Sequence, residues 1–231
     1  MAGWKLISID DSALWHASLE LCGVYDIYHL PEYHLLTMEH EGGQPYLLFF
    51  QEEELCVAIP FVRRPIWKLK GLEEFKKFDA TSVYGYPGLI TNLAKMPDND
   101  GNFISRLQQP FLEALDNLKI ISFFCRQNPL IKTSWLLKDI GEVKELGNTI
   151  AIDLSQSSHD QLKMMSKGHK YDIRKARTAG VSVYEDEKFR RIDDFIAMYK
   201  DTMARLKAGN YYFFDNKYFY DLKKLLKSRV K

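Results

Sequence analysis

The spacing of hydrophobic positions predicts a chain that alternates between strands and helices. Short apolar runs rich in β-branched and aromatic residues predict strands, whereas apolar positions that recur every three to four residues predict amphipathic helices. The predicted strands are Lys5–Ile9, Pro45–Gln51, Leu55–Arg64, Lys119–Cys125, Thr149–Leu154 and Val181–Tyr184. The predicted helices are 12–21, Pro31–Glu39, Phe103–Leu118, Pro129–Leu137, 158–180, Phe189–Leu206 and Asn216–Leu226.

Two of these strands predict a mixed sheet. Pro45–Gln51 and Leu55–Arg64 are separated only by Glu52–Glu54, which is the pattern of an antiparallel hairpin. Strands that alternate with helices elsewhere favour parallel neighbours. We therefore expect an α/β (α+β) fold with two small mixed sheets. The hydrophobic content of 46%, with 13% aromatic residues, is sufficient for a packed core and argues against disorder.

The charge is distributed unevenly and predicts two units. Residues 1–150 contain 14 basic and 20 acidic residues, a net charge of −6, whereas residues 151–231 contain 18 and 11, a net charge of +7. A basic unit in an otherwise acidic chain indicates an anionic partner. We place the boundary at residue 148, with one module at 1–148 and a second at 149–231.

A basic stripe is the strongest functional signal in the second unit. Lys163, Lys167, Lys170, Arg174 and Arg177 recur at spacings of three and four, so on one continuous helix they would share a face. Like charges at these spacings repel one another, which favours a bound anion such as a phosphate. The alternative is a solvated charged face. Charge alone does not separate nucleic acid, phospholipid and nucleotide ligands, and Gly168 can break the helix.

Two further segments are candidate ligand contacts. The loop Val83–Gly88 contains Tyr84 and Tyr86 between glycines and a proline, and predicts either a turn held by aromatic packing or a wall that binds a sugar or peptide. Arg126 directly follows a buried strand, at a position where strand ends commonly contact ligands. The alternative for Arg126 is an ion pair with a carboxylate such as Asp79.

Several other classes of site are not supported by the sequence. The three cysteines are isolated, so they predict neither a zinc site nor a disulfide framework, and they fit a reducing compartment. The histidines show no metal spacing, and the common nucleotide-binding and hydrolase motifs are missing. We therefore predict no metal, no bound cofactor and no transmembrane segment.

Several stretches resemble the FemA/FemX-like proteins (FemAB family) of the GNAT acetyltransferase superfamily. They are 26–33, Tyr84–Gly88, Phe123–Ile131, Thr149–Leu154, Ser166–Val181 and the aromatic positions of 195–219. The resemblance implies two tandem GNAT-like modules with a cleft between them. It also implies that the second module is incomplete, because family members continue beyond residue 231 with strands that complete it. On this basis the chain is expected to be C-terminally truncated, or a fragment.

The resemblance also implies a function and its site residues. It implies an acyl or aminoacyl transferase that acts on an amine of a phosphate-bearing cell-envelope precursor, small or lipid-linked, in the peptidoglycan or polysaccharide pathway. The donor would be aminoacyl-tRNA or acyl-CoA, and the location cytoplasmic or peripheral at the inner face of the membrane. Candidate substrate-binding residues are Tyr84 and Tyr86 with Arg126 on the acceptor side, and Lys167, His169, Lys170, Arg174 and Lys175 near the anionic group.

Two points stay open at the level of sequence. No general base can be nominated, because an unperturbed tyrosine such as Tyr84 is a poor base near neutral pH. The alternative function is a non-catalytic module that binds RNA or another polyanion through the basic helix at 163–177.

Overall fold

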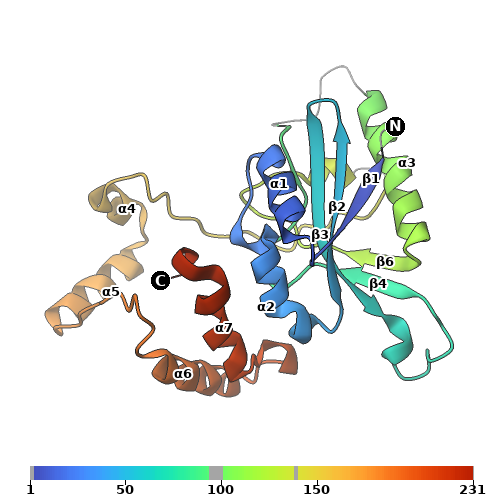
Figure 1. Cartoon of the computed structure of the whole chain (residues 1–231). Helices are drawn as coiled ribbons and strands as arrows, with labels where there is room; N and C mark the ends of the chain where they lie inside the picture. Colours follow the sequence, from blue (N-terminus) through green and yellow to red (C-terminus); the bar gives the residue numbers. More distant parts are fainter. Residues whose placement is uncertain (1–2, 94–100, 138–139, 231) are drawn as a thin grey trace. The chain divides into compact units, whose positions relative to one another are not determined.

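The computed structural model describes residues 3–93, 101–137 and 140–230. The strands are β1 (Trp4–Ser8), β2 (Gln44–Glu52), β3 (Leu55–Pro65), β4 (Phe78–Thr81), β5 (Ile90–Thr91) and β6 (Ile120–Phe124). The helices are α1 (Ser12–Cys22), α2 (Pro31–Glu41), α3 (Gly101–Asn117), α4 (Ser158–Met164), α5 (Lys167–Thr178), α6 (Ile192–Arg205) and α7 (Asn216–Leu226) (Figure 1). The predicted mixed α/β class is confirmed.

Among the described residues, the strands form one mixed sheet, whereas the sequence predicted two small sheets. Its order is β1-β2-β3-β4-β6, and β5 also pairs with β3. Neighbouring strands are antiparallel except β4 and β6, which are parallel. The predicted hairpin is confirmed: β2 and β3 pair from Gln44↔Arg63 to Glu52↔Leu55. The sheet is therefore mixed because a hairpin and one crossover through α3 meet in it.

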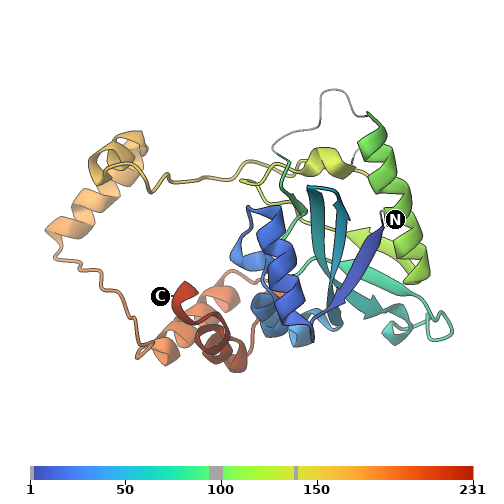
Figure 2. The ribbon, with the colours of Figure 1, turned by 45° about the horizontal axis from the view of Figure 1, so that its top comes forward.

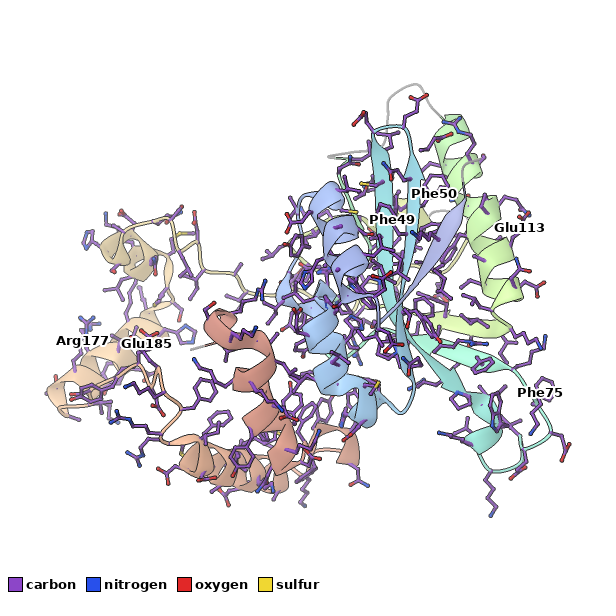
Figure 3. All side chains as sticks on the ribbon, in the orientation of Figure 1. Phe49, Phe50, Phe75, Glu113, Arg177 and Glu185 are labelled. Atoms are coloured by element: carbon purple, nitrogen blue, oxygen red, sulfur yellow. The ribbon has the colours of Figure 1, made fainter. Side chains whose placement is uncertain are left out.

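Helices cover both faces of this sheet. Successive side chains of a strand point to opposite faces, and the neighbours Phe49 and Phe50 accordingly belong to different hydrophobic clusters (Figure 3). The cluster of Phe49 includes Trp15 and Leu19 of α1, whereas the cluster of Phe50 includes Phe111 of α3. Figure 2 shows α1 and α2 on one side of the strands and α3 on the other.

The last helix completes the core on one face of the sheet. Helix α7 packs along α2, and its Leu226 is fully buried in the same cluster as Trp15. The contacts divide the chain into a sheet unit, Met1–Lys144 with Ile192–Val230, and a second unit, Glu145–Arg191. This grouping assigns α6 and α7 to the sheet unit, whereas the sequence grouped them with the basic helix. The tandem-module organisation with a boundary at residue 148 stays a prediction.

The second unit differs from its prediction in two ways. The expected strands Thr149–Leu154 and Val181–Tyr184 are wrong, because neither pairs with any strand among the described residues; Ile150 and Val183 are 93% and 94% exposed. Apolar alternation describes one face of a strand, but a strand also needs a neighbour to pair its backbone.

The single basic helix is also wrong, because the chain breaks at Met165–Ser166 into α4 and α5. The Ser166 side chain accepts a hydrogen bond from the His169 backbone N–H at 3.2 Å and caps α5. Gly168 therefore lies in the first turn of α5 and not at the break. At the other end, Gly180 takes the predicted left-handed conformation, with φ of 72°.

Candidate functional site

A buried carboxylate joins three distant segments of the sheet unit. Glu41 is the last residue of α2 and is 6% exposed. Its Oε1 atom accepts a hydrogen bond from the Tyr84 backbone N–H at 2.9 Å and another from the Tyr211 hydroxyl at 2.7 Å. Gly42 follows in the left-handed conformation, with φ of 74°, and ends α2 there. A buried carboxylate is costly unless it is hydrogen-bonded, so these two donors account for its position.

The loop that carries Tyr84 is held tightly against the η1 turn (Ile27–His29). Gly85 has φ of 105°, and a Cβ atom at this position would lie 2.3 Å from Cε1 of Tyr28. Asn128 donates from Nδ2 to the backbone oxygen of Tyr86 at 3.3 Å. Tyr86 itself is 42% exposed, and its ring contacts Tyr28 at a centroid distance of 6.2 Å. The predicted turn stabilised by aromatic packing is therefore what the structure shows.

Tyr211 lies in an aromatic environment on the η4 turn (Asn210–Tyr212). Its ring centroid is 4.7 Å from that of His40 and 6.0 Å from that of Tyr84. Burial raises the pKa of Tyr211, the hydrogen bond to Glu41 raises it further, and the nearby Arg126 guanidinium lowers it in part. The phenol is therefore protonated at neutral pH and is the donor toward Glu41.

Two arginines flank this pair. Arg126 is half-buried; its backbone N–H donates to Oγ of Ser82 at 3.1 Å, and its guanidinium lies 5.4 Å from the Phe124 ring centroid. Arg64 of β3 forms a bidentate ion pair with Asp79 of β4. Its Nε donates to Oδ1 at 3.0 Å and its Nη2 to Oδ2 at 2.5 Å. Asp79, the carboxylate considered for Arg126, is thus paired with Arg64.

The sheet unit therefore brings together Tyr84 and Arg126, but not Tyr86, around Tyr211 and Glu41. A guanidinium, a phenol and a carboxylate in series can bind an anionic or hydroxyl-bearing group and can pass a proton. Sequence reasoning missed Glu41, His40 and Tyr211. The aromatic run at 211–214 was a signal for the third, whereas nothing local marks Glu41, since its partners lie 43 and 170 positions away in the chain.

A hollow lies between α2 and α7. It has a volume of about 240 Å³ and adjoins the Glu41 cluster through His40 and Phe214. Lys217 crosses its rim, with Nζ 3.0 Å from Asp221 and 3.7 Å from Glu39. Two carboxylates of this hollow, Asp221 and Glu39, are therefore already paired with a lysine.

The remaining candidate residues all lie on α5 of the second unit. Lys167, His169, Arg174 and Lys175 are exposed, and Lys170 is partly exposed, with Nζ donating to the Lys163 backbone oxygen at 2.7 Å. Figure 3 labels Arg177 on this helix.

Arg174 and Lys175 line an open depression of about 570 Å³ with Tyr171, Thr178 and Ala179. The stripe is thus divided, because Lys163 belongs to α4. An anion site on α5 stays a prediction.

The described ranges contain no group of three or more His, Cys, Asp or Glu side chains arranged to hold a metal ion. Among the same residues, every helix is too short or too polar to cross a bilayer.

Comparison with known proteins finds a match to one family model over part of the chain. Residues 136–231, a little over two-fifths of the chain, match the model of the FemAB family. This match covers the second unit together with α6 and α7. No curated protein and no solved structure matches the chain.

Proposed function

We propose that this FemAB-like protein is an aminoacyl or acyl transferase of the peptidoglycan or a polysaccharide pathway, acting on an amine of a phosphate-bearing cell-envelope precursor. The FemAB match over residues 136–231 is the observation that carries the proposal, because FemAB is a family of aminoacyl transferases. The Glu41–Tyr211–Arg126 cluster supports it independently, since it offers an accessible proton-passing group beside a cation.

The two units would then have different roles. The acceptor would bind to the sheet unit, with Tyr84 and Arg126 against its polar groups, and Lys167, His169, Lys170, Arg174 and Lys175 of α5 would contact a phosphate. The donor would be aminoacyl-tRNA or acyl-CoA, which are cytoplasmic molecules, and we place the reaction in the cytoplasm or at the inner membrane surface.

The reaction is the attack of an amine on an ester or thioester carbonyl. The rate of such a reaction depends on holding the two reactants in line and on stabilising the oxyanion that forms at the carbonyl. Both tasks suit a fixed site with cationic and hydrogen-bonding groups.

A transfer assay tests the proposal directly. The full chain is incubated with radiolabelled aminoacyl-tRNA, or with acetyl-CoA, and with nucleotide-linked or lipid-linked muramoyl pentapeptide as acceptor. We expect a labelled acceptor whose mass increases by one acyl or aminoacyl residue. Transfer should occur with one of the two donor classes and not with the other. Absence of transfer with both donors and both acceptors would contradict the proposal.

The exposure of the basic residues on α5 supports the alternative of a non-catalytic polyanion-binding module. This alternative predicts binding to generic RNA that weakens steeply with salt. The double variant Lys170→Ala/Arg174→Ala would reduce both the affinity and the salt slope, whereas Lys68→Ala/Lys70→Ala in the sheet unit provides a charge-matched control. Selective binding of a diphosphate-bearing precursor over RNA would favour the transferase instead, and equal diphosphate affinity in the variant would remove the anion site.

A further inference from the structure

Among the described residues, one side-chain hydroxyl is hydrogen-bonded to the Glu41 carboxylate and can carry a proton to it. Glu41 is 6% exposed, and its bonded partners are the Tyr84 backbone N–H and the Tyr211 hydroxyl. A backbone N–H donates a hydrogen bond but does not exchange its proton with a reactant in a catalytic step. A phenol donates and accepts at the same oxygen. Tyr211 is also only partly buried, so it can contact a bound molecule that Glu41 cannot reach.

We propose that Tyr211 and Glu41 together remove the proton from the attacking amine: Tyr211 contacts the amine, and Glu41 receives the proton through the phenol. This inference rests on the proposed transfer to an amine. It assigns a role to two residues that the sequence did not nominate, and it makes Tyr211 the catalytic residue and Glu41 the group that acts through it.

The step conserves atoms and charge. The amine nitrogen forms a bond to the carbonyl carbon of the donor and becomes an ammonium. That nitrogen loses a proton to the Tyr211 oxygen while the Tyr211 proton passes to Oε1 of Glu41. The bond between the carbonyl carbon and the leaving oxygen or sulfur then breaks. The leaving group takes the proton back along the same route, so Glu41 ends as a carboxylate.

Charged and titratable groups from every neighbouring segment favour this assignment. Arg126, after β6, counteracts the rise in the pKa of Tyr211. Its positive charge therefore stabilises a transient negative charge on the phenol oxygen. Arg64 of β3 interacts electrostatically with Glu41 and Tyr211. His40 of α2 lies against the Tyr211 ring, and its buried Nε2 has no hydrogen-bond partner. The rings of Tyr84 and Tyr212 are further titratable neighbours, with centroids 6.0 and 5.6 Å from that of Tyr211.

The decisive variant is Glu41→Gln. The amide oxygen of glutamine can still accept from Tyr84 and Tyr211, so the local structure is kept, but it does not take up a proton near neutral pH. We expect kcat to fall about a hundredfold, the usual scale of a general base, with KM nearly unchanged.

Tyr211→Phe tests the same route without touching Glu41 or its bond to Tyr84. We expect a comparable loss of kcat. A matched control exists in α6 and α7, where the Tyr220 hydroxyl donates to the carboxylate of Asp193 on an exposed surface. Tyr220→Phe and Asp193→Asn remove the same kind of contact away from the site, and both should retain the wild-type kcat.

The outcomes separate this inference from the proposed function. Absence of transfer by the wild-type chain contradicts the function itself. Transfer by the wild type with near-wild-type kcat in Glu41→Gln, or in Tyr211→Phe, overturns the proton route and leaves the function standing. Thermal unfolding of each variant identifies any that fail to fold. If one of the two fails, the kcat of the other, folded variant decides whether the proton route stands.

Discussion

Two buried histidines make the stability of the sheet unit depend on pH. His29 and His34 are fully buried on either side of the start of α2. The Asp26 backbone N–H donates to Nδ1 of His29 at 3.0 Å, and Nε2 of His34 lies 3.1 Å from the Tyr28 backbone oxygen, to which it donates. The other ring nitrogen of each has no partner. A proton added to either ring would therefore be buried in an apolar environment or would break a bond.

The expected size of the effect follows from the two shifts. Burial lowers the pKa of His29 to about 4, and burial together with the neighbouring His29 lowers the pKa of His34 to about 3. Below the ordinary histidine pKa of 6.5 the unfolded chain binds these protons and the folded chain does not, so stability falls as the pH falls. Each histidine contributes about 1.4 kcal/mol per pH unit between about pH 4 and 6.5. The two histidines together therefore lower the free energy of unfolding by about 4 kcal/mol when the pH falls from 8 to 5.

Urea unfolding at a series of pH values, followed by tryptophan fluorescence, measures this slope. Trp15 is a suitable reporter because its ring centroid lies 5.2 Å from that of His34. The control variants keep the hydrogen bonds without the titration: glutamine at 34 can donate to the Tyr28 oxygen, and asparagine at 29 can accept from Asp26. Each single substitution should reduce the slope by about 1.4 kcal/mol per pH unit. Slopes equal to that of the wild type in His29→Asn and His34→Gln would refute the reasoning.

Two further substitutions test local features. Gly85→Ala should lower the free energy of unfolding by about 2 kcal/mol or more, because it adds left-handed strain and a clash with the Tyr28 ring; unchanged stability in urea would show that this loop yields easily. Ser166→Ala should remove about 1 kcal/mol from α5 and speed amide exchange in its first turn, whereas Ser155→Ala, in the segment before α4, should leave that exchange rate as it is.

Elements with their own end signals could be predicted from the sequence. Helix α7 was predicted with its observed bounds, and the structure shows that Asp215 caps it and accepts from the Tyr218 N–H at 2.7 Å. The β2–β3 hairpin is similarly local. The sequence could not predict structure that depends on distant partners. Thr149–Leu154, for example, has strand-like alternation but pairs with no strand among the described residues.

The candidate site shows the same limit. Tyr84 and Arg126 could be selected from their positions in a loop and at a strand end. Glu41 could not, because its role depends on the Tyr211 hydroxyl, 170 positions away. A break in the basic helix was considered at Gly168 but lies at Met165–Ser166, because the capping serine within the run of charge was not recognised.

The sheet unit is built from two segments that are separated in the sequence, and this affects how it folds during synthesis. Synthesis proceeds from the N-terminus, and the residues that cover α2 lie at Ile192–Val230, after the whole second unit. When Lys144 leaves the ribosome, α2 therefore still lacks the helix that buries part of its surface, including the aromatic contacts around His40. Contacts of such long separation form slowly, and exposed apolar surface invites aggregation in the meantime. The nascent chain is thus most vulnerable while the basic segment is being synthesised, and Glu41 acquires its phenol partner among the last events of folding.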